Sequence, residues 1–321
     1  MLWSRRKGVS ILVIGGMGFI GARITKFLIE MGEEVVVAGR QPTLYRLRDI
    51  ADKVKVVQGD KAHIDQIFDW IRTYKVKKVV DASSDLEVAC EEAPFAASKL
   101  NITGTLNVFE ACRIMGIRRV VWASSLAVYG DKKRAKGNPQ NEDVLNDPVT
   151  VYGAIKNYEE FMTEVYNAKW DMDIVGLRPS SIYGPLRTSG LTTWLTDMVK
   201  NPLNGQPVDI PTGPDETSNF CFVDDCADAF VQCCQYEGDR LPHAIYYIGG
   251  FKASVRELMG EIKRQIPETE VRYHGRPIYY IDTIDNSRLC KDLGFKLKYD
   301  ISAGIREQIA KQRALNEGQG S

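Results

Sequence analysis

Two residue types that together can move a proton stand four positions apart in the sequence. Tyr152 and Lys156 enclose Gly153-Ala154-Ile155, and on a helix this spacing places both side chains on one face. A free tyrosine has a pKa of about 10, too high for a base at neutral pH, but a neighbouring ammonium favours the phenolate and lowers that pKa. We therefore predict that Tyr152 is a general acid/base for carbonyl–alcohol interconversion and that Lys156 is its electrostatic partner. A purely structural tyrosine and lysine are the alternative.

A glycine-rich segment near the start of the chain has the spacing of a dinucleotide site. It reads Gly15-Gly16-Met17-Gly18-Phe19-Ile20-Gly21 and follows an apolar run. We expect Gly15 to permit a tight turn, Gly18 to let the backbone approach a pyrophosphate, and Gly21 to allow close helix packing. The helix that opens with Phe19 and Ile20 would offer free N–H groups and a favourable dipole to the phosphates. A purely structural turn is the alternative.

The end of the next apolar run bears on which dinucleotide binds. It reads Ala38-Gly39-Arg40. A site selective for NAD usually has a carboxylate here for the ribose 2′-hydroxyl, and Gly39 takes its place. Arg40 adds a guanidinium that suits a 2′-phosphate. We predict a preference for NADP, with NAD left open and a solvated arginine as the alternative.

Short β-rich runs alternate with longer helical patterns, and this order of elements must position the residues above. The predicted helices are Phe19–Met31, Ile64–Tyr74, Pro94–Met115 and Tyr152–Trp170. The predicted strands are near-continuous apolar runs, as expected where both faces of a sheet are covered: Val9–Ile14, Glu34–Ala38, Val54–Val57, Lys78–Ala82, Arg119–Ala123, Asp173–Leu177 and Ala244–Ile248. The alternation predicts an α/β fold of Rossmann type, with a doubly wound parallel sheet.

The regular alternation of predicted strands and helices ends after Arg178. Gly184 to Asn219 is rich in Gly, Pro, Thr and Asn, and the stretch from Gly250 to Ser321 has helical patterns with few strong strands. We predict a dinucleotide-binding domain of residues 1–178, to which residues 219–249 return. A smaller C-terminal substrate-binding domain would then comprise residues 179–218 and 250–321.

Several motifs together resemble the extended short-chain dehydrogenases/reductases, the NAD-dependent epimerase/dehydratase family. They are the Gly-x-x-Gly-x-x-Gly loop, Tyr-x-x-x-Lys, and the segment Leu177-Arg178-Pro179-Ser180-Ser181-Ile182-Tyr183-Gly184-Pro185. The resemblance implies that Ser125, rather than Ser124, donates a hydrogen bond to the substrate oxygen, and that Lys156 also holds the cofactor ribose. It also implies that Asp60 contacts the adenine of the cofactor and that Ala82 and Ser83 cover the cofactor. Two further residues are implied to bind the cofactor: Lys61, which stands where relatives often have an apolar residue, and Pro179. Ser84 is expected to face the substrate, and Asn101 lies near the site or packs its helix.

Departures from the family pattern narrow the function. Relatives that dehydrate sugar nucleotides carry Asp-Glu where this chain has Leu126-Ala127, so no carboxylate is present to move the extra proton. Ser181 and Ser218 replace an asparagine and an arginine that grip the substrate diphosphate, although Arg276 stays a candidate for a second phosphate-binding arginine. We predict reversible hydride transfer between NADP(H) and a secondary alcohol or ketone. The alternatives are a sugar-nucleotide 4-epimerase with tightly bound NAD(P) and a catalytically silent NADP-binding sensor.

Composition gives no sign of other partner classes. Lys+Arg and Asp+Glu both number 42, and binding of nucleic acid or anionic lipid needs clustered positive charge; the short run Ser4-Arg5-Arg6-Lys7 is expected to be a solvated tail. No apolar run reaches the about 20 residues of a membrane helix, and no signal peptide is visible, so a cytoplasmic location is expected. Seven cysteines without a Cys-x-x-Cys pair and three scattered histidines predict no metal site.

The resemblance implies a homodimer, formed through helices Pro94–Met115 and Tyr152–Trp170.

Overall fold

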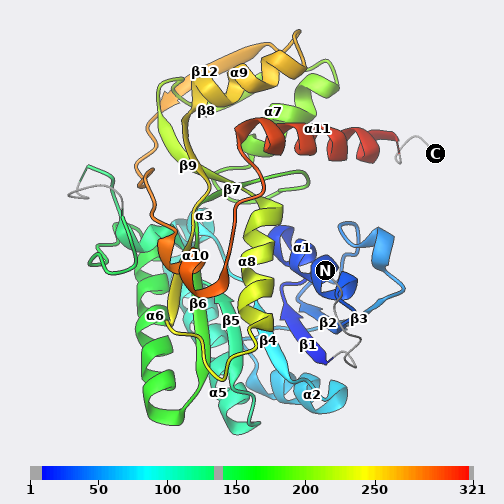
Figure 1. The fold of residues 1–321 in the computed structure, drawn as a ribbon, viewed down its shortest axis with the longest axis vertical. Helices are drawn as coiled ribbons and strands as arrows, with labels where there is room; N and C mark the ends of the chain where they lie inside the picture. Colours follow the sequence, from blue (N-terminus) through cyan, green and yellow to red (C-terminus); the bar gives the residue numbers. More distant parts are fainter. Residues whose placement is uncertain (1–8, 134–139, 318–321) are drawn as a thin grey trace.

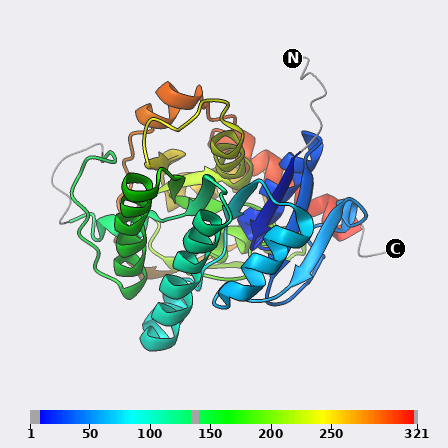
Figure 2. The same ribbon diagram turned by 90° about the horizontal axis from the view of Figure 1, so that it is seen from below.

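The computed structural model describes residues 9–133 and 140–317 (Figures 1 and 2). The basic run Ser4–Lys7 lies outside these residues. Within the described part of the chain, no helix combines the length and the apolar character needed to cross a bilayer.

Seven parallel strands form the central sheet, in the order β10-β6-β5-β4-β1-β2-β3. The direction in which strands are added reverses between β1 and β4, which is the switch point where doubly wound folds bind their ligands. Each predicted strand is present, with its ends within one or two residues, and the predicted Rossmann-type sheet is confirmed. The strands are β1 (Ser10–Ile14), β2 (Glu34–Gly39), β3 (Val54–Gln58), β4 (Lys78–Asp81), β5 (Arg119–Ala123), β6 (Asp173–Pro179) and β10 (Ile245–Ile248).

Helices cover both faces of this sheet, as the apolar strands require (Figure 2). Side chains alternate along a strand, so Ile11 and Val13 of β1 join the core beneath α1 and α8, whereas Leu12 and Ile14 join the core on the opposite face. The first face carries α1 (Phe19–Glu30) and α8 (Val223–Gln235), and the second carries α2 (Ile64–Tyr74), α5 (Gly104–Ile114) and α6 (Val151–Trp170).

The predicted helix Pro94–Met115 is present as one continuous helical stretch, but it contains a π-helical segment that the sequence did not predict. After α3 (Glu87–Glu92) the chain forms α4 (Pro94–Ser98), a π-helical turn over Lys99–Thr103, and then α5. Gly104 packs tightly here, because a Cβ on it would lie 2.8 Å from Cγ of Lys61. The wider turn leaves Asn101 buried beside the pocket described below. Turns of this kind occur often at functional sites.

A second layer of elements lies at the carboxyl ends of the central strands, above the sheet in Figure 1. One small sheet has the order β11-β9-β7, and β8 pairs with β12 in another, while α10 packs against β10 of the central sheet. Most of β9 lies within the predicted return segment 219–249, but β9 belongs to the small sheet, whereas α8 and β10 belong to the main layer. The bounds are β7 (Ser181–Tyr183), α7 (Trp194–Leu203), β8 (Val208–Thr212), β9 (Thr217–Phe222), β11 (Phe251–Ser254), α9 (Val255–Gln265), β12 (Val271–Arg276), α10 (Ser287–Leu293) and α11 (Ile301–Glu317), with short 3-10 turns at Arg48–Ile50 and Leu126–Tyr129.

Candidate active site

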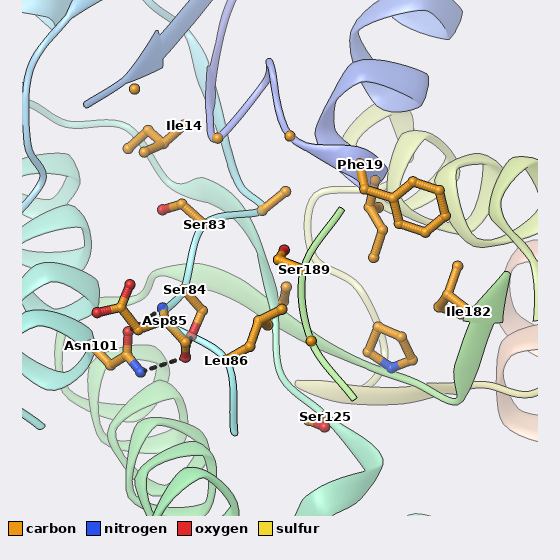
Figure 3. Close-up of a pocket in the computed structure, with 18 of the residues that line it drawn as sticks. Ile14, Phe19, Ser83, Ser84, Asp85, Leu86, Asn101, Ser125, Ile182 and Ser189 are labelled. Atoms are coloured by element: carbon orange, nitrogen blue, oxygen red, sulfur yellow. Dashed lines mark hydrogen bonds between the residues drawn. The ribbon is translucent and has the colours of Figure 1, made fainter. Parts of the chain in front are cut away.

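A cavity of about 820 Å³ opens at the carboxyl ends of the central strands. Figure 3 shows Phe19 and Ile182 on one side of it, the segment from Ser83 to Leu86 on the other, and Ser125 at its base. Gly21, Lys156 and Arg276 are predicted site residues that do not line the cavity. The predicted residues that do line it are Gly15, Gly18, Phe19, Ile20, Arg40, Asp60, Lys61, Ala82, Ser83, Ser84, Ser125, Tyr152, Pro179 and Ser181.

The glycine loop forms one wall, and its shape depends on missing side chains. Gly15 has φ +75°, and a Cβ on it would lie 2.9 Å from the carbonyl oxygen of Ala82. A Cβ on Gly21 would lie 2.1 Å from the carbonyl oxygen of Gly15, so Gly21 shapes the site by packing against the loop. No side chain caps the N-terminus of α1 at Gly18. The free N–H groups there fit a pyrophosphate, and the wall fits a dinucleotide.

Arg40 reaches the cavity from the end of β2 and meets an acid that the sequence did not point to. Its Nη2 lies 3.0 Å from Oδ1 of Asp85, in the loop that follows β4. The guanidinium is more than half exposed. The pair therefore joins two rims of the cavity, and the Asp85 carboxylate partly offsets the charge that we expected a 2′-phosphate to meet.

Lys61 is buried and braces the cofactor-facing loop from behind. Its Nζ donates to Oδ2 of Asp81 at 2.6 Å and to the carbonyl oxygen of Ser83 at 2.9 Å. Asp81 also accepts from the hydroxyl of Ser83 at 2.6 Å. The ammonium is thus held by protein groups beneath the loop, whereas neighbouring Asp60 lines the cavity with its Oδ1 accepting from the Ala62 N–H at 2.9 Å.

Tyr152 lies in the first turn of α6 and faces Ser125. The start of α6 packs tightly on the turn that follows Ser125, since a Cβ on Gly153 would lie 2.4 Å from the carbonyl oxygen of Ala127. The Ser125 hydroxyl is a neighbour of the phenol that lowers the pKa of Tyr152, and its Oγ accepts from the Ala127 N–H at 3.1 Å. The hydroxyl of Ser124 instead donates to Glu160 at 2.5 Å. The structure therefore brings Ser125, and not Ser124, to the tyrosine.

Lys156 lies behind Tyr152, in the core. Its Nζ is 5.7 Å from the centroid of the Tyr152 ring and donates to Oε2 of Glu159 at 2.9 Å. Burial raises the pKa of Tyr152, and Lys156 only partly opposes this, while Glu159 adds to the rise. Lys156 thus lowers the pKa of Tyr152 as predicted, but in the protein alone burial and Glu159 outweigh the ammonium and the net pKa is raised.

Arg187 is a cavity residue that the sequence analysis missed. Its Nη1 and Nε donate to the carbonyl oxygens of Ile182 at 2.9 Å and Ser189 at 3.1 Å, and its guanidinium lies 5.4 Å from the centroid of the Phe19 ring. Among the described residues no carboxylate forms an ion pair with it, and burial lowers its pKa to about 10. A desolvated cation of this kind is suited to binding an anion. Its one sequence signal is its position just after Gly184-Pro185.

Arg46, also missed, ties the glycine loop to the segment that follows β7. Its Nη1 donates to the carbonyl oxygen of Met17 at 3.2 Å, and its Nη2 donates to that of Leu186 at 2.8 Å and to Oγ1 of Thr188 at 2.9 Å. This tether holds the segment that carries Arg187 against the dinucleotide wall.

The far end of the cavity is lined by side chains from segments distant in the sequence. The phenols of Tyr279 and Tyr280 both donate to Glu87 at the start of α3, and Glu87 and Tyr280 line the cavity. Asn101 fixes the adjacent loop through both backbone groups of Asp85, at 2.9 and 3.0 Å (dashed in Figure 3).

The residues at the positions expected to bind a substrate diphosphate either hydrogen-bond to each other or lie outside the cavity. The hydroxyls of Ser181 and Ser218 lie 2.8 Å apart and share a hydrogen bond, and Ser218 is buried. Arg276 is exposed at the end of β12, outside the cavity. Neither Ser218 nor Arg276 therefore presents a cation or a free donor to a ligand in this pocket.

Comparison with known proteins matches residues 11–249 to the NAD-dependent epimerase/dehydratase family. The chain belongs to this family. It is 27% identical over 314 residues to the UDP-glucose 4-epimerase of Mycolicibacterium smegmatis, an alignment that covers 93% of this chain and 96% of the relative. The predicted resemblance is confirmed, and so is the prediction that the chain is an enzyme.

Two solved structures of proteins with different activities have the same fold as this chain. A GalE-like L-threonine dehydrogenase from Cupriavidus necator superposes with a TM-score of 0.85 at 25% identity, covering 94% of this chain and 99% of that one. The UDP-glucose 4-epimerase of Thermus thermophilus in complex with NAD gives 0.83 at 24% identity, covering 95% and 99%. Proteins with this fold thus include a dehydrogenase and an epimerase.

Proposed function

We propose that this family member is a dehydrogenase/reductase that catalyses net hydride transfer between a nicotinamide dinucleotide and a secondary alcohol or ketone. The observation that carries the proposal is the engaged Ser181–Ser218 pair, together with the place of Arg276 outside the cavity. A sugar-nucleotide epimerase must hold a diphosphate, and charge-assisted bonds are the strong ones for that task.

Tyr152 and the side chains around it carry out the proton transfer of this reaction. The cofactor, when bound, gives or takes the hydride. Tyr152 donates its phenolic proton to the oxygen of a reduced carbonyl and takes it back in the oxidative direction. Ser125, a neighbour of Tyr152 in the same cavity, donates to the same substrate oxygen and holds it next to the phenol. Lys156 acts on Tyr152 through its charge.

A mass balance of the cofactor tests this proposal. A net reductase consumes one NADPH or NADH for each molecule of product, whereas an epimerase regenerates its cofactor in each cycle and leaves the nicotinamide absorbance unchanged. We would screen hydroxy acids, keto-sugars and sugar nucleotides with both cofactors. Isomerisation of a sugar nucleotide without net cofactor change would replace this proposal by the epimerase. Tight cofactor binding with no turnover of any class would favour the sensor.

NADP is the cofactor that we propose on the grounds of Gly39 and Arg40. Gly39 places no carboxylate at the ribose, and the Arg40 guanidinium lines the cavity with its side chain 58% exposed. It is accessible to a 2′-phosphate if it exchanges Asp85 for that group. Fluorescence titration of Arg40→Ala should show weaker NADPH binding and unchanged NADH binding. Wild-type protein that binds NADH more tightly would overturn the preference.

We also propose a homodimer, formed through α6 and its neighbours. Exposed large apolar side chains gather on these helices: Phe95 of α4 is 85% exposed and Phe161 of α6 is 65% exposed, with Tyr158, Ile114 and Trp170 also on the surface. Patches of this kind mark interaction sites. Light scattering of the wild type should give twice the chain mass of 36.1 kDa, and Phe161→Asp should shift it toward the monomer. A wild-type monomer at micromolar concentration would overturn the proposal.

A further inference from the structure

Two consecutive glutamates of α6, Glu159 and Glu160, are buried in the core behind the tyrosine. Only one of them has hydrogen-bond partners for both of its carboxylate oxygens among the described residues. Glu160 bonds to Arg178 at 2.6 and 2.8 Å and also accepts from Ser124. Glu159 is 0% exposed, and its Oε2 accepts from Lys156, itself 1% exposed, at 2.9 Å. Its other oxygen, Oε1, is buried without a hydrogen-bond partner among the described residues. Lys156 is therefore the group that accounts for a carboxylate at this depth.

The other charged groups near this pair come from several elements. Asp81 of β4 acts on Lys156 but is bonded to Lys61. Cys90 of α3 acts on Tyr152 and is affected by Glu91 and Glu159, and burial raises the pKa of this thiol to about 11, so it is neutral at physiological pH. Arg187 approaches Tyr152 from the cavity side.

We propose that Glu159 is a positioning residue for the active site: its buried carboxylate holds the Lys156 ammonium behind Tyr152 and offsets its charge, so that Tyr152 keeps its proton for delivery to the substrate. The inference rests on the proposed role of Tyr152 as the acid/base. It concerns a residue three positions after the lysine, outside the Tyr-x-x-x-Lys motif.

The sign of the effect follows from the charges. Burial is the largest single influence and would lower the pKa of Lys156, but Glu159, with smaller contributions from Tyr152 and Asp81, outweighs it and the pKa is raised. The ammonium thus stays charged, while the adjacent carboxylate cancels much of its field at the phenol. Removal of one negative charge lowers the apparent pKa of every proton-binding group nearby. Whichever of Tyr152 and Lys156 then releases the first proton, the pair titrates at lower pH.

The test is Glu159→Gln, read without substrate or turnover. The ultraviolet absorbance of phenolate is titrated in this variant and in Glu159→Gln/Tyr152→Phe, and the difference isolates Tyr152; the same pair is measured with Glu159 intact. We expect Glu159→Gln to lower the midpoint by about one to three pH units. The pH profile of alcohol oxidation should move in the same direction. Glu164→Gln, an exposed change on the same helix, should leave both where they are.

Two further variants separate charge from structure. Glu159→Asp keeps the charge and should restore most of the wild-type midpoint. Should loss of one partner of the buried pair prevent folding, Lys156→Met/Glu159→Gln removes both charges, and its midpoint should lie below that of Lys156→Met. An unmoved or raised midpoint, or an equal shift in Glu159→Asp, would overturn the inference. Because the titration uses no substrate, its result does not depend on whether the enzyme is a reductase or an epimerase.

Discussion

The two ends of the cavity are built in different ways. The dinucleotide end is mainly backbone: a loop whose glycines leave no room for a Cβ, and a helix N-terminus without a side-chain cap. The far end is built of side chains, with Glu87 and Tyr280 meeting across 193 residues of sequence. Tyr152 and Arg187 stand where the two ends join.

This difference separates what the family shares from what each member does. Backbone walls depend on spacing and on the absence of side chains, so they accept the dinucleotide in epimerases and dehydrogenases alike. We expect side chains at the far end to decide which substrate can lie beside the tyrosine. The engaged serines at 181 and 218 belong to that second group.

The largest effect that we expect divides chemistry from cofactor binding. Tyr152→Phe removes the proton that the reduced carbonyl must receive, and positioned acid/base groups typically contribute about 10²–10⁴-fold. Turnover should fall by that order, while NADPH affinity, measured by fluorescence titration, should stay within about twofold because the dinucleotide wall is backbone. Ser125→Ala is the matched variant, since it removes the other hydroxyl and should cost less. Full activity in Tyr152→Phe would contradict both the reductase and the epimerase.

Arg187 tests where the boundary between the two ends lies. A charge-assisted hydrogen bond contributes about 1.5–3 kcal/mol, so Arg187→Met should weaken the binding of its anion by about 10- to 100-fold. Because the guanidinium lies over Phe19, at the start of α1, we expect the weakened ligand to be the dinucleotide. Isothermal titration with NADP⁺ measures this, and Arg72→Met, at an exposed position of α2, is the control. Unchanged cofactor affinity together with a raised KM for the substrate would instead show that Arg187 binds the substrate.

The sequence predicted the two ends unequally, for physical reasons. The glycine loop and Tyr152–Lys156 are local patterns, so spacing along one strand, turn or helix suffices to find them. Arg187 and the Glu87–Tyr280 contact depend on segments that only the folded chain brings together. The π-helical segment at 99–103 and the raised pKa of Tyr152 were missed because both depend on packing and burial. Glu159 was missed because it belongs to no motif.

A smaller effect tests whether the dinucleotide wall depends on backbone shape. Gly15 has φ +75°, a conformation that costs an L-residue about 1–2 kcal/mol, and a Cβ there would press on the Ala82 carbonyl and the Ser83 side chain. Gly15→Ala should therefore weaken cofactor binding by roughly tenfold and lower Tm by a few degrees. Gly116→Ala is matched in backbone, with φ +70° and no atom near its Cβ; it should lower Tm and leave cofactor affinity unchanged. Equal loss of affinity in both variants would show that the effect is general strain.

The smallest expected effect concerns the Arg40–Asp85 ion pair, which joins two rims of the cavity. Asp85 holds Arg40 at 3.0 Å, and a 2′-phosphate must take that guanidinium from it while lying near a like charge. Asp85→Asn keeps the shape and removes the negative charge, so NADPH should bind more tightly by a few fold, the size expected of an exposed ion pair of about 0.2–1 kcal/mol. NADH affinity should not change, because a ribose hydroxyl carries no charge to repel. The gain should shrink as salt rises and disappear in Arg40→Ala/Asp85→Asn, a double-mutant cycle that isolates the pair. Weaker NADPH binding in Asp85→Asn would instead make the Arg40–Asp85 bridge part of the cofactor wall.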